Sequence, residues 1–150
     1  MIKTILVPVD GSEHANKAIG LASDLAQKYD ARLIALNVMT EFGSDRVPAE
    51  LRDFERLEHV RLTERSVLDS ESERILSDAK LQAREKGAPN VETVRRSGDA
   101  APIILEVAND QNADLIVMGS RGLGNVKGLL LGSVSHKVAQ LSECSCITVK

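Results

Sequence analysis

Short, almost continuously apolar runs alternate with longer amphipathic segments along the whole chain, and this alternation constrains the fold more than any other feature. The first run, residues 2–9, is rich in β-branched residues and stops at the turn-forming triplet Asp10-Gly11-Ser12, which is typical of a strand buried on both faces. Strands that alternate with helices, without a repeat or a linker, pack as a parallel α/β sheet. We therefore expect one domain over residues 1–150: a Rossmann-like open sheet of five parallel strands in the order 3-2-1-4-5, with helices on both faces.

The other elements follow from hydrophobic spacing and from signals at helix ends. After Ser12, apolar residues recur every three or four positions up to Tyr29 and predict a helix that packs closely through its many alanines. Residues 50–86 contain no Gly or Pro and precede Gly87, so they predict a long helix, with residues 69–72 as a candidate interruption. Further helices are expected after Asp99 up to about residue 109 and over residues 133–141, and further strands at residues 32–39, 91–95, 114–118 and 146–149.

Composition narrows the classes of function. The chain has a net charge of -3, one Tyr, two Phe and no Trp, which argues against a stacking surface for single-stranded nucleic acid and against a binder of phosphate backbones. No run approaches the ~20 apolar residues that cross a bilayer. The apolar residues 5–9 are unlike a signal peptide, because Pro8 breaks them and Asp10 closes them. We therefore expect a cytoplasmic protein that binds neither nucleic acid nor membrane.

The cysteines and histidines do not predict a metal site. Cys144 and Cys146 lie one residue apart in a predicted strand, where their side chains share a face but are poorly placed to form a disulfide. His14, His59 and His136 are scattered and lack the spacing of zinc ligands. We expect two reduced thiols that pack as small apolar side chains, and we interpret His136 as a surface or packing residue rather than a general base.

The ends of two strands predict a ligand cleft. Ligands of open α/β sheets bind beyond the carboxyl ends of the strands, at the point where the strand order reverses. In the expected order, the first strand, which ends near Asp10, lies beside the fourth strand, which ends near Gly119. An acidic residue and a glycine-rich segment would then share one cleft.

The glycine-rich segment, residues 119–132, indicates an anion site in this cleft. It holds five of the chain's ten glycines, which let backbone N–H groups converge on an anion and permit the positive φ angles of such a nest. The helix that starts at Ser133 offers a second anion site, and Arg121 and Lys127 supply countercharge. The segment matches neither a P-loop nor a dinucleotide-binding fingerprint. On composition alone, a flexible loop that binds nothing is the alternative.

The order of these glycines resembles a known signature. The pattern Gly119-x2-Gly122-x9-Gly132-Ser133 matches the nucleotide-binding signature of the universal stress protein family, in its ATP-binding branch. The resemblance covers the whole chain. ILVPVDGSEHANKAI is similar to the first strand and helix of that family, LIALNVM to its second strand, SGDAAPII to its third turn, and DLIVMGSRG with LLGSVSHKV to its ATP-binding segment.

The resemblance implies a site for ATP, with or without Mg²⁺, in the expected cleft. The ATP phosphates and ribose would be held by Gly119, Gly122, Gly132 and Ser133, with Met118, Ser120, Arg121 and Val134 beside them. Asp10 would face the adenosine, and the backbone at Pro8 and Val38 would border the adenine. Asp10 and Ser133 can equally cap the helices that follow them, and the two roles are compatible.

The function that the resemblance implies is that of an ATP-binding regulatory protein of the stress response, in which the nucleotide acts as a switch. Two alternatives stay open: a slow ATPase or phosphotransferase, and a dimeric interaction scaffold without nucleotide. We expect no catalytic residue, because fast phosphoryl transfer needs a positioned base and a metal held against the phosphates, and only Asp10 is placed for an indirect metal contact. We expect residues 123–131 to become ordered on binding.

The last predicted strand, residues 146–149, would be an edge of the sheet with unpaired N–H and C=O groups. Pairing with a second copy about a two-fold axis would satisfy these groups on both chains, and the resemblance implies the same contact. We therefore expect a homodimer through the C-terminal strand. The sequence identifies neither a protein partner nor a particular stress.

Overall fold

The computed structural model describes residues 1–40, 54–123 and 131–150, and it describes side chains throughout these ranges except in residues 54–64. The strands are β1 (Thr4–Pro8), β2 (Arg32–Met39), β3 (Asn90–Ser97), β4 (Leu115–Gly119) and β5 (Ser145–Val149), and the helices are α1 (Glu13–Tyr29), α2 (Phe54–Glu85), α3 (Ala100–Asp110) and α4 (Ser133–Leu141). All strand pairs are parallel, and the sheet order is β3-β2-β1-β4-β5. The predicted fold class and strand order are confirmed.

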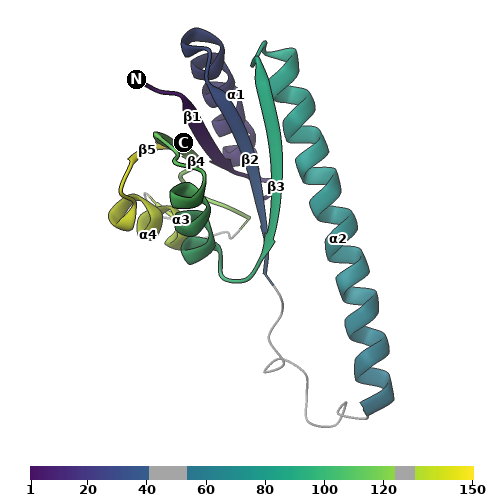
Figure 1. Cartoon of the computed structure of the whole chain (residues 1–150). Coiled ribbons are helices and arrows are strands. Elements are labelled where there is room, and N and C mark those ends of the chain that lie inside the picture. Colours follow the sequence, from purple (N-terminus) through teal and green to yellow (C-terminus); the bar gives the residue numbers. More distant parts are fainter. Residues whose placement is uncertain (41–53, 124–130) are drawn as a thin grey trace.

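Helices cover both faces of the sheet, with α1 and α2 on one face and α3 and α4 on the other (Figure 1). The central strand β1 feeds both layers through the alternation of its side chains. Ile5 and Val7 pack with α1 and α2, whereas Leu6 packs with α3 and α4. The continuous apolar run of β1 is therefore explained by burial on both faces.

Helix α1 begins and ends where the sequence predicts. The Ser12 hydroxyl caps it by accepting a hydrogen bond from the Ala15 N–H at 3.2 Å, and Asp30 ends it in the left-handed conformation at φ 53°. The expectation that Tyr29 belongs to the buried stripe is wrong. It is 44% exposed, because the helix ends there and the ring lies beside the Lys28 ammonium, 5.8 Å from its centroid.

Helix α2 is continuous across residues 69–72, so the expected interruption does not occur. Ser72 lies on the same face as the buried Ile75 and Ala79, and this face packs against the sheet. On the outer face, Arg74 forms ion pairs with residues three positions before and four positions after it, a spacing that supports a helix. Residues 50–53, where the helix was expected to start, lie outside the described residues.

Several other boundaries differ from prediction by one to two residues. Strand β1 is shorter than residues 2–9, and β3 is longer than residues 91–95, because all eight residues of β2 pair with it. The last two strands also shift, since β4 runs into Gly119 and β5 begins at Ser145. Both cysteines are free and partly buried, but Cys144 precedes β5 rather than lying within it. No helix among the described residues is long and apolar enough to cross a bilayer.

Candidate functional site

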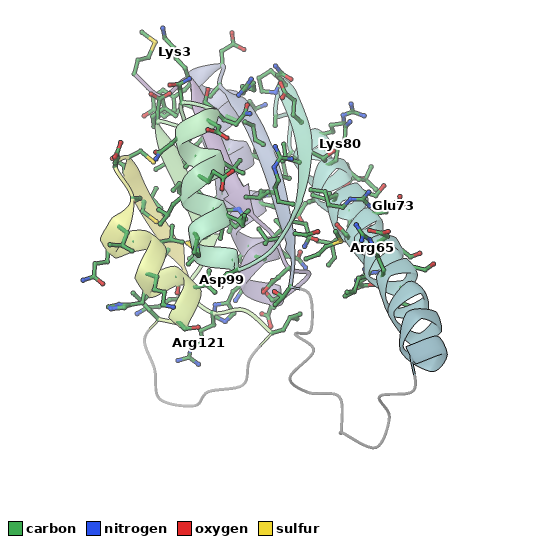
Figure 2. All side chains as sticks on the ribbon, turned by 60° about the horizontal axis from the view of Figure 1, so that its bottom comes forward. Lys3, Arg65, Glu73, Lys80, Asp99 and Arg121 are labelled. Atoms are coloured by element: carbon green, nitrogen blue, oxygen red, sulfur yellow. The ribbon has the colours of Figure 1, made fainter. Side chains whose placement is uncertain are left out.

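A cavity of about 580 Å³ opens at the carboxyl ends of β1, β2 and β4, the position expected for a ligand in an open α/β sheet. Its walls also include residues of α2, α3 and the start of α4. Figure 2 shows Arg121 at this end of the sheet, opposite to Lys3. The predicted site residues that line the cavity are Pro8, Asp10, Val38, Met118, Gly119, Arg121, Gly122, Gly132, Ser133 and Val134.

Ser120 is the predicted site residue that does not line the cavity. It is 1% exposed, and its hydroxyl lies 3.1 Å from Nδ1 of His14. Its backbone N–H donates to the Val149 carbonyl at 2.7 Å, and its carbonyl accepts from the Gly132 N–H at 2.6 Å and from the Ser135 hydroxyl at 2.7 Å. Ser120 therefore joins β4 to α1, β5 and the start of α4 behind the cavity wall.

One of the two predicted reasons for the glycines, a positive φ angle, is wrong at the three signature positions. Among the described residues, glycines with positive φ occur at Gly11, Gly87 and Gly98 only, so φ does not explain the signature. The lack of room for a side chain explains two of the signature glycines. A Cβ at Gly119 would lie 2.8 Å from the His14 Cβ, and a Cβ at Gly122 would lie 2.6 Å from Oδ2 of Asp10, whereas at Gly132 the nearest atom is 3.5 Å away.

Asp10 is held in place at the end of β1. Its Oδ1 accepts a hydrogen bond from the Ser12 N–H at 2.9 Å, and its other oxygen faces the space where Gly122 has no side chain. The absence of a Cβ at Gly122 thus lets the turn after β4 approach the Asp10 carboxylate. The Asp10 carboxylate, just after β1, therefore lies in the cavity wall beside the backbone of the turn that follows β4.

The start of α4 faces the same cavity. The helix cap is Gly132, not Ser133, and it makes no side-chain capping bond. The first N–H groups of an α-helix have no partner within the helix and create a positive end that favours an anion. Ser133 is exposed, so its hydroxyl is available at this end, while the Ser135 hydroxyl is directed back to the Ser120 carbonyl.

Charge along the cavity is mixed. The charged residues that line its described part are Asp10, Glu71 and Arg121. A hydrogen bond from Arg74 is the main cause that lowers the pKa of the exposed Glu71, which therefore remains ionised near neutral pH. The described residues contain no group of three His, Cys, Asp or Glu side chains that could hold a metal ion. His136 is exposed and does not line the cavity.

The wall formed by α2 and α3 was not predicted. It consists of Leu68, Glu71, Ser72 and Ile75 from α2, and Ala100 and Ile104 from α3. No sequence motif marks these residues, because their place depends on how the helices pack over the ends of the strands. Asn37 also lines the cavity, and a visible signal was present there: it is the one polar residue in the apolar run of β2.

Part of the predicted anion site cannot be compared with the structure. Residues 124–130 lie outside the described residues, and they include Gly124, Lys127 and Gly128. The countercharge at Lys127 and the ordering of residues 123–131 stay predictions.

Comparisons with known proteins agree with the fold and with the family that the sequence resembles. The model of the universal stress protein family matches residues 1–150. The universal stress protein YxiE of Bacillus subtilis is 37% identical over 158 residues, with all of both chains covered. The solved structure of the universal stress protein UspA from Lactobacillus plantarum superposes with a TM-score of 0.82 at 27% identity, covering 99% of this chain and 98% of that one. A universal stress protein solved in complex with cAMP gives a TM-score of 0.73 at 27% identity, covering 99% of this chain and 97% of that one.

Proposed function

The chain belongs to the universal stress protein family, and on that premise we propose that it is a regulatory protein that binds ATP in the cavity at the carboxyl ends of β1, β2 and β4. The observation that carries the proposal is the cavity itself, which brings ten of the eleven predicted site residues together. Its volume of about 580 Å³ falls in the range of small-molecule sites, roughly 300–1,000 Å³. A similar protein was solved with cAMP, another adenine nucleotide.

The two ends of the cavity differ in the way that a nucleotide requires. The apolar end, near Val38 and Ile104, suits a base. The opposite end combines Arg121, the close turn at Gly122 and the uncapped start of α4, which suits phosphates because backbone N–H groups and the helix dipole favour anions. The residues present therefore fit ATP, and Asp10 is the carboxylate through which a magnesium ion would be held indirectly.

We propose further that ATP is held rather than turned over rapidly. At the phosphate end, the described lining residues supply backbone groups, a hydroxyl, a guanidinium and the Asp10 carboxylate, which accepts a hydrogen bond from the Ser12 N–H. Rapid phosphoryl transfer uses both a positioned base and a group that holds the metal, and Asp10 can serve in only one of these roles. Equal binding of ground state and transition state does not accelerate chemistry. Phosphate release of several per second by the pure protein, lost in Asp10→Ala, would favour the alternative of an ATPase or phosphotransferase.

A switch role is supported by the contacts of Ser120. Its N–H is bonded to the Val149 carbonyl of β5, and its carbonyl is bonded to the start of α4. A ligand that favours one position of this turn would therefore also favour one position of β5, which is what a population shift requires. Because β5 pairs with β4 alone among the described strands, we propose that residues 146–149 form a homodimer contact and transmit the state of the site to it.

ATP binding is tested with Gly132→Val. A Cβ at this position would be in ordinary contact, with its nearest atom 3.5 Å away, so we expect the valine variant to fold, which its circular dichroism spectrum checks, and its larger side chain to hinder a phosphate at the start of α4. Titration calorimetry should give at least a tenfold loss of ATP affinity, and mass spectrometry of the denatured wild type should identify the released nucleotide. Thr93→Val, at an exposed position of β3 outside the cavity, is the control. Unchanged ATP affinity in folded Gly132→Val, or none in the wild type, would overturn the proposal.

The dimer is tested by sedimentation equilibrium at micromolar concentration. The wild type should sediment as twice the mass of 16.2 kDa, and Ile147→Pro should weaken the association, because proline disturbs the backbone of the edge strand. A monomeric wild type, or a dimer that is indifferent to Ile147→Pro in a folded variant, would contradict the contact.

A further inference from the structure

His14 joins three parts of the fold behind the cavity wall. It is the second residue of α1, and its Nδ1 lies 3.1 Å from the Ser120 hydroxyl oxygen and 3.4 Å from the Val149 carbonyl oxygen. Ser120 directly follows β4, and Val149 is the last residue of β5. One ring nitrogen therefore contacts both the turn after β4 and the end of the strand for which a dimer contact is proposed.

The two neighbours of Nδ1 determine how it bonds. The Val149 carbonyl can only accept a hydrogen bond, whereas the Ser120 hydroxyl can donate or accept. A proton on Nδ1 therefore lets the ring donate to both oxygens, with the shorter and stronger contact to Ser120. We assign the ring proton to Nδ1 on the basis of this network. In this form His14 ties β4 and β5 to α1 at one point.

The start of α1 is itself fixed to the wall of the cavity. Its capping residue, Ser12, accepts a hydrogen bond from the Ala15 N–H at 3.2 Å, and the Ser12 N–H donates to Oδ1 of Asp10 at 2.9 Å. The backbone of His14 also lies close to Gly119, since a Cβ there would be 2.9 Å from the His14 carbonyl carbon. A shift of the turn after β4 relative to Asp10 must therefore strain or break the contacts of the His14 ring.

His14 itself is partly buried and is not one of the residues that line the described part of the cavity. Its side chain therefore acts on a ligand only through the residues that it contacts. The backbone bond from the Ser120 N–H to the Val149 carbonyl already joins the turn to β5, and His14 adds the connection of both to α1 and, through the helix cap, to Asp10.

We propose that His14 is the positioning residue that couples the cavity to β5. A nucleotide that holds the turn after β4 against Asp10 also holds the contacts of His14 with Ser120 and Val149. The end of β5 is then ordered before a second copy binds, and association through β5 becomes stronger. By linkage, association strengthens nucleotide binding by the same factor. This inference rests on the proposed function, which supplies the nucleotide and the dimer, and it adds the side chain that connects them.

The test begins with a thermodynamic cycle on the wild-type protein. Sedimentation equilibrium gives the dimer dissociation constant with and without saturating ATP, and calorimetry gives the ATP affinity below and above that concentration of protein. ATP should tighten the dimer by at least about fivefold, and dimer formation should tighten ATP binding by the same factor. ATP binding and a dimer that are independent of each other would overturn the coupling alone. A protein that binds no ATP, or that forms no dimer, would overturn the proposed function as well.

Three variants assign the coupling to Nδ1 of His14. His14→Leu removes the nitrogen and should reduce the coupling factor to below about twofold, since one hydrogen bond accounts for roughly a two- to tenfold effect. His14→Asn places an amide nitrogen near the position of Nδ1 and should retain at least half of the wild-type factor. His136→Leu makes the same change at an exposed histidine outside the cavity and should keep the full factor. Unchanged coupling in folded His14→Leu, or equal loss in all three variants, would overturn the assignment.

A double-mutant cycle tests the route through Ser120. Ser120→Ala removes the other partner of the 3.1 Å contact, so it should also lower the coupling factor, and the double variant should lose no more than His14→Leu alone. Additive losses in the double variant would overturn the route through Ser120. If His14→Leu does not fold, Ser120→Ala decides, because full coupling in that variant would overturn the inference.

Discussion

Substitution of Gly119 by alanine should destabilise the fold itself, although this glycine belongs to the nucleotide-binding signature. A Cβ there would lie 2.8 Å from the His14 Cβ, 2.9 Å from the His14 carbonyl carbon and 3.0 Å from the Ala15 nitrogen. Ordinary contacts of a Cβ begin at about 3.4 Å, and two of the three atoms are backbone, so α1 would have to move by several tenths of an ångström. That helix cannot move freely, because Ala15, Ala18 and Ala22 are buried against the sheet.

The magnitude follows from the cost of overpacking a core, about 1–3 kcal/mol, with a backbone clash at the upper end. For a chain of this size each kcal/mol lowers the melting temperature by about 2–4 °C, so Gly119→Ala should melt roughly 6–12 °C below the wild type. Calorimetry and urea unfolding without nucleotide measure this. Gly132→Ala, whose Cβ would meet nothing closer than 3.5 Å, is the control and should change the free energy of unfolding by less than about 1 kcal/mol. Equal stability of the two variants would refute the reasoning.

Two further predictions concern titratable groups. The backbone N–H groups of Lys3 and Thr4 bind the Asp114 carboxylate and hold its pKa below the ordinary value of 3.8. Because the unfolded chain takes up the proton first, the contribution of this carboxylate to the free energy of unfolding is present above pH 4 and is lost as the pH falls below it. Asp114→Asn should therefore flatten the fall of the urea midpoint between pH 5 and pH 2.5. Burial raises the pKa of the Cys144 and Cys146 thiols, so at pH 8 iodoacetamide should alkylate the folded protein more slowly than the urea-unfolded chain. Equal rates in the two states would contradict this second expectation.

The parts of the fold that depend on local chemistry could be predicted from the sequence. The bounds of β2 and α4 agree with prediction, because apolar runs and helix end signals are properties of a few neighbouring residues. The strand order was also predictable. Pairing of β1 with both β2 and β4 places the end of β1 beside Gly119, and this juxtaposition brings Asp10 to the cavity.

The features that could not be predicted depend on residues that are distant in the sequence. The need for glycine at position 119 is explained by His14, which is distant in the sequence but lies next to Gly119 because α1 packs on β4. The inward position of Ser120 likewise depends on His14 and on Val149 of the last strand. The α2 wall has no motif at all, since any helix with a suitable apolar face would have satisfied the same sequence pattern.

The length of α2 determines how the molecule will behave in solution. Its 32 residues span about 48 Å at 1.5 Å per residue, whereas the eight residues of β2 span only about 26 Å. The helix therefore projects well past the end of the sheet, as Figure 1 shows. A protein with such an arm experiences more hydrodynamic drag than a sphere of equal mass, so it will elute early from a sizing column. A monomer measured in that way will be mistaken for a larger particle, and only methods that report mass independently of friction will distinguish one chain from two.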